Sequence, residues 1–159
     1  MTRDAPSAAQ RTDTGGPGGA GLGRRAYAFG VRVPYPHEEA VARTKAALQG
    51  QGFGVLTEID VQRTLREKLG HEMGRYVILG ACNPQLALRG LTAEQELGGL
   101  LPCNVVVYED RDAGGETVVV AQDPQQLLGA VGNPALTPVA AEARRRLEQV
   151  LAALGGRPR

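Results

Sequence analysis

The stretch that decides the fold runs from Tyr76 to Pro84 and reads YVILGACNP. Its first six residues, Tyr76 to Ala81, form a short and unbroken apolar run, as in a central strand that is covered on both faces. Asn83 and Pro84 then form a helix cap followed by a first-turn proline. The stretch therefore predicts a buried strand that leads directly into a helical turn.

Four further strands are predicted on either side of this stretch. Tyr27 to Val33 and Phe53 to Val61 alternate apolar with other side chains at the period of two that marks a half-buried strand. Asn104 to Tyr108 and Thr117 to Ala121 are rich in valine. The acidic, glycine-containing segment between these last two runs is typical of a hairpin loop.

Helices are predicted between the strands from caps, prolines and glycine stops. Pro36 opens a helix that Gly50 stops, and Asp60 is placed to cap a short helix that Gly70 ends. Later in the chain, a capping box in the segment 92–95 predicts another short helix, and Asp-Pro at 123–124 predicts one more. The clearest helix starts at Thr-Pro, 137–138, and carries an apolar stripe as far as residue 154.

The order of these elements predicts an α/β protein of the α+β type. We expect a single two-layer sandwich, in which a mixed sheet of about five strands carries helices mainly on one face. The domain is placed at residues 25–156, with regular structure starting at Tyr27. Residues 1–24 are rich in Gly, Pro and Ala and cannot bury enough apolar surface to offset the entropy of ordering, so we expect a disordered tail.

The composition argues against several classes of protein. Basic and acidic residues nearly balance, 18 against 17, whereas a nucleic-acid binder normally has a basic domain. No apolar run approaches the length of about 18 residues that a membrane span needs, and no secretory signal is visible, so we expect a cytoplasmic protein. A serine nucleophile is excluded, because the only serine is Ser7, in the tail.

The segments 76–84 and 100–108, which read YVILGACNP and LLPCNVVVY, carry a resemblance to a known family. The chain resembles the bacterial family catalogued as domain of unknown function 302, from about Tyr27 to Leu154. Arg24 and everything before it lie outside the resemblance. What the resemblance implies is a compact two-layer α/β sandwich that is dimeric and has no established activity. It supplies no catalytic residue.

Two segments are the candidate functional site: Cys82 with Asn83, and Cys103 with Asn104. Each places a thiol beside an amide at the end of a strand. One interpretation is a binding module for a small molecule, a metal or a partner, centred on these segments. The other is structural, because free cysteine is among the most buried residue types and Asn83 is a helix cap.

A metal site, an enzyme and an anion site are the remaining hypotheses for this surface. Two cysteines fall short of a zinc site, so a third ligand has to come from His71, His37 or a carboxylate. A thiolate enzyme or thiol-redox protein using Cys82 or Cys103 is the alternative function, and Lys68 is a candidate for holding an anionic ligand. No cofactor is predicted.

Other charged residues have mainly structural interpretations. Carboxylates for acid–base chemistry are available at Glu58, Asp60, Glu109 and Asp123, but Asp60 and Asp123 are better explained as caps and Glu109 as a loop charge. The basic run at 144–146 is interpreted as a solvated helix face.

The distance between Cys82 and Cys103 depends on strand direction. Antiparallel strands put both thiols at one end of the sheet, whereas parallel strands separate them by about 15 Å or more. The 20 intervening residues permit either geometry. We favour proximity, because both cysteines precede an asparagine and have a proline close by.

A homodimer is also predicted. A two-layer sandwich leaves one sheet face or an edge strand uncovered, and the valine runs 105–107 and 118–120 supply apolar side chains to both faces. An exposed apolar face of that kind is a common association surface.

Overall fold

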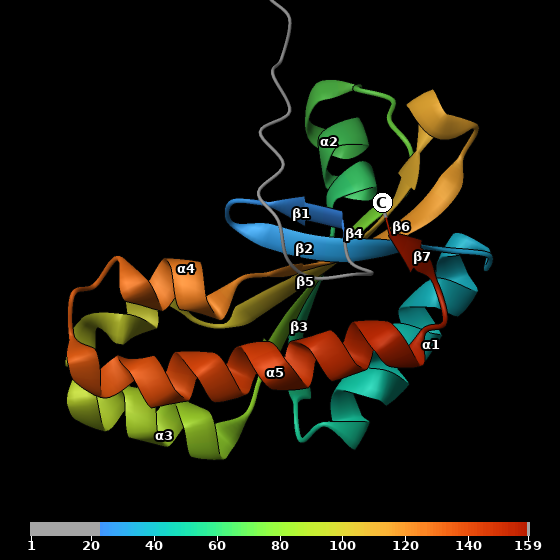
Figure 1. Ribbon diagram of the computed structural model, residues 1–159. Helices are drawn as coiled ribbons and strands as arrows, with labels where there is room; N and C mark the ends of the chain where they lie inside the picture. The colour runs from blue at the N-terminus through green and yellow to red at the C-terminus, as the bar shows by residue number, and fades with distance from the viewer. Residues whose placement is uncertain (1–22, 159) are drawn as a thin grey trace, which may run out of the picture.

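The computed structural model of the protein describes residues 23–158 (Figure 1). The predicted tail therefore lies outside the described residues as far as residue 22. Regular structure starts at Gly23 rather than at Tyr27, because residues 23–25 pair with the first predicted strand. At the other end, a two-residue strand at 157–158 extends past the predicted boundary of residue 156.

The chain alternates strands with short helices. The strands are β1 (Gly23–Arg25), β2 (Ala28–Val33), β3 (Gly54–Asp60), β4 (Tyr76–Cys82), β5 (Cys103–Asp110), β6 (Glu116–Gln122) and β7 (Arg157–Pro158). The α-helices are α1 (His37–Gly50), α2 (Val61–Leu69), α3 (Pro84–Ala93), α4 (Pro124–Gly129) and α5 (Thr137–Ala153). Three short 3₁₀ helices are η1 (Gln95–Leu100), η2 (Arg111–Ala113) and η3 (Pro134–Leu136).

All described strands form one sheet in the order β1-β2-β6-β5-β4-β3, with β7 paired to β2. The five predicted strands are confirmed, and two short strands are added beside β2. The prediction of mixed strand directions is wrong, because every neighbouring pair is antiparallel. The segment from α3 to η1 returns the chain to β5 without a parallel crossover, so β4 and β5 run in opposite directions.

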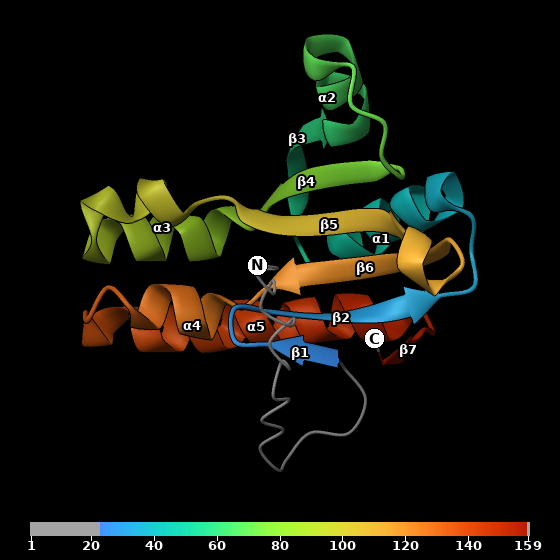
Figure 2. The ribbon, with the colours of Figure 1, turned by 90° about the horizontal axis from the view of Figure 1, so that it is seen from above.

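The predicted α/β class, with helices mainly on one face of the sheet, is confirmed. Helices α1 and α5 lie together beneath the sheet in Figure 1. Their apolar sides meet alternate residues of β2, β4, β5 and β6 in one core, which includes Phe29, Leu79, Val105 and Leu147. A second apolar cluster joins α3, α4 and the first half of α5, which extend beyond the end of the sheet (Figure 2).

Helix α2 stands apart from the other helices, beside β3 and β4 rather than over β5 and β6 (Figures 1 and 2). The predicted cap of this helix is confirmed: the Asp60 carboxylate accepts a hydrogen bond from the Arg63 backbone N–H at 2.8 Å. Gly70 ends the helix with a φ of +64°, a conformation that favours glycine. None of the residues in α2 is buried.

The predicted capping box at 92–95 is wrong. Thr92 lies inside α3, where its hydroxyl donates to the Leu88 carbonyl at 2.8 Å instead of capping a new helix. Helix α3 continues to Ala93, and the 3₁₀ helix η1 follows. The local pattern misleads here because a threonine one turn into a helix can bond backward along it.

Replacing Gly30 by alanine is expected to destabilise the protein by about 1–3 kcal/mol. A Cβ at this position would lie 2.4 Å from the Val119 carbonyl oxygen, so the backbone of β6 would have to move. Gly50 is the matched control, because a Cβ there meets nothing within 4 Å and alanine favours the helix. Urea unfolding checks both variants, and equal effects of the two substitutions would contradict this packing.

Candidate functional site

The antiparallel pairing of β4 with β5 places Cys82 and Cys103 at the same end of the sheet. Ala81 lies directly opposite Cys103 in the register, so Cys82 is one residue further along. Both cysteines are free, and both line a small apolar cavity between the sheet and the second cluster. The geometry that we favoured from the sequence, with the two segments close together, is the one found.

The cavity beside the two thiols is too small for an ordinary ligand. Its free volume of about 30 Å³ holds one or two water molecules, whereas ligand pockets usually measure hundreds of Å³. Asn83 is 7% exposed, and its side-chain oxygen accepts from the Leu86 backbone N–H at 3.1 Å. That bond confirms Asn83 as the cap of α3. Asn104 is exposed and faces the opposite side of the sheet from Cys103, because strand residues alternate.

The environment of Cys103 favours the protonated thiol. Burial raises the pKa of this thiol from 9.0 to about 11, and the neighbouring Cys82 adds to the shift, while Gln122 opposes it. At neutral pH the side chain is therefore a small apolar group rather than a thiolate. The structural interpretation is the better one for Cys103.

The raised pKa of Cys103 makes stability depend on pH. Above pH 9 the unfolded chain loses a thiol proton that the folded chain keeps up to about pH 11, so stability falls as the pH rises through this window. The loss is expected to reach about 2–3 kcal/mol. Urea unfolding at pH 8 and pH 10.5 should show a smaller loss in Cys103→Ala than in the wild type. Equal losses in the two proteins would contradict the shift.

Lys68 and His71 do not join the cysteines. Both are exposed, Lys68 on α2 and His71 in the loop after it, which leads to the Tyr76 end of β4. Cys82 lies at the other end of this seven-residue strand, about 20 Å away along it. The predicted metal set of Cys82, Cys103 and His71 is therefore not assembled. Residues 23–158 hold no group of three His, Cys, Asp or Glu side chains that could bind a metal ion.

A larger and more polar cavity lies at the Tyr76 end of β4. Its volume is about 350 Å³, and α1, β3, α2 and β4 contribute to it. His37, the first residue of α1, lines it and is only 6% exposed. The sequence suggested His37 only as a metal ligand. A histidine that follows two prolines and precedes two acids at a helix start was the available signal. The lining residues are His37, Glu38, Val41, Glu58, Asp60, Gln62, Arg75, Tyr76 and Val77.

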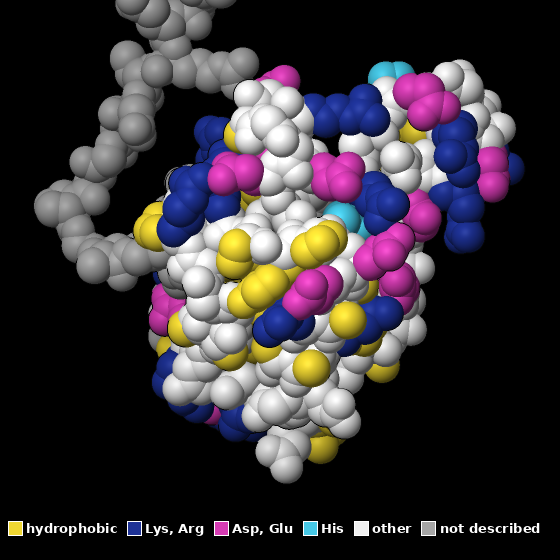
Figure 3. Space-filling model, turned by 90° about the vertical axis from the view of Figure 1, so that its right-hand side faces the viewer, with side chains coloured by type: hydrophobic (Ala, Val, Ile, Leu, Met, Phe, Trp, Pro, Cys, Tyr) yellow, Lys and Arg dark blue, Asp and Glu magenta, His cyan; other side chains and the backbone are white. Residues whose placement is uncertain are grey.

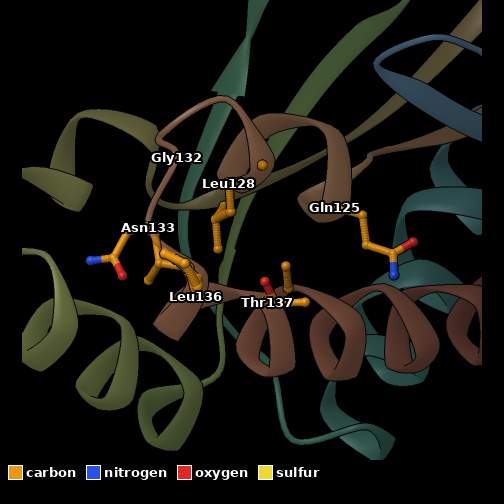
Figure 4. Close-up of a pocket in the computed structure, with 9 residues that line it drawn as sticks. Gln125, Leu128, Gly132, Asn133, Leu136 and Thr137 are labelled. Atoms are coloured by element: carbon orange, nitrogen blue, oxygen red, sulfur yellow. The ribbon is translucent and has the colours of Figure 1, made fainter.

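A third cavity, of about 400 Å³, lies between α4 and the start of α5 (Figure 4). Leu128 and Leu136 supply apolar surface, while Gln125 and Thr137 extend from the two helices toward the space between them. The Asn133 amide is already engaged, since it donates to the Ala93 carbonyl and accepts from the Ala135 backbone N–H. No charged side chain lines this cavity.

The sheet face opposite α1 and α5 carries an apolar row. Ile59, Ile78, Val106 and Val120 lie directly opposite one another on β3, β4, β5 and β6. Figure 2 looks onto this face, and no helix lies in front of β5 and β6. We call these four residues the association row.

Two tyrosines lie beside the association row on the same face. The rings of Tyr76 and Tyr108 stack, with centroids 5.6 Å apart and planes 24° apart. Burial raises the pKa of Tyr76, and the neighbouring Tyr108 and Tyr27 raise it further. The row and the two rings together form a continuous patch of large side chains.

The fold thus defines an open antiparallel α/β sandwich with one free sheet face. Residues 29–154 match the family model described as domain of unknown function DUF302, and the chain belongs to that family. It is similar to the crystal structure of an uncharacterised conserved DUF302 protein from Bacillus stearothermophilus. The identity is 35%, the TM-score is 0.75, and the match covers 80% of this chain and 98% of that one. No curated protein matches the chain.

One further property of the described residues bears on the class of protein. None of the helices in residues 23–158 is both long enough and apolar enough to cross a membrane.

Proposed function

We propose that this domain is a cytoplasmic binding module that works as a homodimer, with two copies pairing through the association row. The observation that carries the proposal is the in-register run of four branched aliphatic side chains across a sheet face that no helix covers. Ile59 is 48% exposed, and Ile78, Val106 and Val120 are each partly exposed. Burying such a patch against a second copy is favourable, because it removes apolar surface from water.

The surroundings of the row support an interface. Arg32 donates to Asp110 at 2.8 Å and to Glu116 at 3.2 Å, which places a charged network on one side of the patch. Asn104 lies on the other side. An apolar centre with a polar rim is the usual composition of a protein–protein interface.

A second copy of the chain is a better occupant than the N-terminal segment. Residues 1–22 contain only two large apolar side chains, Met1 and Leu22. This is too little to cover a row that spans four strands. The family match also begins only at residue 29, so the N-terminal segment lies outside the conserved domain model.

A binding module is favoured over a thiol enzyme. The pKa of about 11 at Cys103 keeps this thiol protonated at neutral pH, whereas a catalytic cysteine needs a lowered pKa. Two free cysteines are also what a reducing cytoplasm maintains. The cysteines are therefore assigned to packing at the end of the sheet.

Nucleic acid is not a proposed partner. Lysines and arginines are interspersed with acidic side chains over the face shown in Figure 3, rather than gathered into a basic stripe. The run at 144–146 does not provide such a stripe. Arg145 and Arg146 both bind Glu142 at 2.7 Å, and these hydrogen bonds lower the pKa of that carboxyl to about 2. Contacts with phosphates would need free cations.

Light scattering on the full chain tests the proposal. At tens of micromolar protein, the expected mass is twice the 16.7 kDa of one chain. A mass of one chain at that concentration overturns the homodimer.

A further inference from the structure

The polar cavity at the Tyr76 end of β4 carries an unbalanced charge. Its lining includes three carboxylates, from Glu38, Glu58 and Asp60, and one guanidinium, from Arg75. The groups paired with them are Lys45, which binds Glu58, and Glu109, which lies 3.8 Å from Arg75. Counted with these partners, the cluster has four carboxylates and two cations, an excess of two negative charges. The cavity therefore favours a cation.

The one guanidinium in the lining is already occupied. Arg75 donates through Nη1 to Glu38 at 2.6 Å, and its backbone N–H donates to Glu109 at 3.1 Å. Its side chain also extends beside the Glu109 carboxylate. An anionic ligand would have to displace these carboxylates, so the cavity is not an anion site.

The hydrogen-bonding groups left over in the lining are acceptors. His37 is 6% exposed, and its Nε2 lies 3.1 Å from the Val107 carbonyl oxygen. An Nε2–H that donates to this carbonyl leaves Nδ1 of the neutral ring with a lone pair, and no described residue donates to it. Gln62 uses its amide N–H for the Met73 carbonyl at 2.9 Å, which leaves its side-chain oxygen as an acceptor.

Asp60 supplies a charged acceptor. One of its oxygens, Oδ1, accepts from the Arg63 backbone N–H at 2.8 Å, and no described side chain forms an ion pair with this carboxylate. Val41 and Val77, which are 9% and 8% exposed, supply apolar surface to the same cavity. The site thus combines acceptors, excess negative charge and an apolar contact for a short alkyl chain.

We propose that this cavity binds a small aliphatic diamine in its diammonium form. The ammonium N–H groups donate to the Asp60 carboxylate and to Nδ1 of His37, and the methylene chain lies against Val41 and Val77. Two positive charges match the excess of two negative charges. A metal ion is a poorer candidate, because no group of three metal-binding side chains is found in residues 23–158. This site is separate from the association row, and its test does not depend on the dimer.

Calorimetric titration of the full chain with 1,4-diaminobutane tests the site. The wild type is expected to bind it saturably, with one diamine per chain, and not to bind butyrate. Asp60→Asn should weaken binding at least tenfold while keeping the helix cap, since asparagine caps as well as aspartate. Asp112→Asn, which removes an exposed charge in the β5–β6 loop, is the matched control and should keep the wild-type affinity.

The fold and the ring provide independent readouts. The melting temperature of Asp60→Asn should stay close to that of the wild type, and diamine should shift the ¹⁵N resonances of the His37 ring in the wild type but not in Asp60→Asn. Binding of butyrate, absence of saturable diamine binding by the wild type, or equal weakening by Asp60→Asn and Asp112→Asn overturns the proposal. The light-scattering mass reports on the dimer separately.

Discussion

Replacing Asp123 by alanine is expected to lower the free energy of unfolding by about 3–5 kcal/mol, because it leaves a buried arginine without its partner. Asp123 is 2% exposed and forms an ion pair with Arg144, whose side chain is 11% exposed. The guanidinium of Arg144 also lies over the Phe29 ring, 4.8 Å from its centroid, and cannot easily reach water. The same substitution removes the cap of α4, where Asp123 accepts from the Gln125 backbone N–H at 3.0 Å.

Glu148→Ala is the matched control for Asp123→Ala. Glu148 is the second partner of Arg144, at 2.9 Å, but its side chain is 41% exposed, so its removal should cost less than about 1 kcal/mol. Urea unfolding at neutral pH measures both. A loss below about 1 kcal/mol in Asp123→Ala would show that Arg144 finds other solvation.

Replacing Val106 by lysine is expected to dissociate the homodimer. Val106 is the third residue of the association row and lies between Ile78 and Val120 in the register. In a dimer formed through this face, the substitution places an ammonium group in the apolar centre of the interface, where it has no acidic partner in the row. Light scattering should show the mass of one chain over the concentrations at which the wild type is dimeric.

Leu88→Lys is the control for that experiment. Leu88 is 69% exposed on α3, away from the sheet face, so the same kind of substitution there should leave the dimer intact. The circular dichroism of both variants should match that of the wild type. A dimeric Val106→Lys, or a Leu88→Lys variant that dissociates equally, would contradict the assignment of this face.

Local features of the fold could be predicted because short segments determine them. Asp60, Asn83 and Asp123 each cap a helix as expected, since a cap involves only the next two or three residues. The five main strands follow from apolar patterns within single segments. The direction of β5 relative to β4 could not be predicted, because the 20 residues between the two cysteines allow a crossover or a return.

The candidate sites show the same limit. The basic run at 144–146 looked like a solvated helix face, but Arg144 is half-hidden against Phe29 and bonded to Asp123, 21 positions away. His37 and Asp60 line one cavity only because α1 and β3 pack side by side. By contrast, the structural interpretation of Cys103 and Asn83 was available from the residue types alone.

The most direct test of the homodimer through the association row is an isotope-filtered NOE experiment on a mixture of methyl-labelled and unlabelled chains. It detects contacts between methyl groups of different copies only. The account predicts intermolecular NOEs at Ile59, Ile78, Val106 and Val120, and none at Leu88. Intermolecular NOEs confined to the helices, or none at all at concentrations where light scattering shows a dimer, would contradict it.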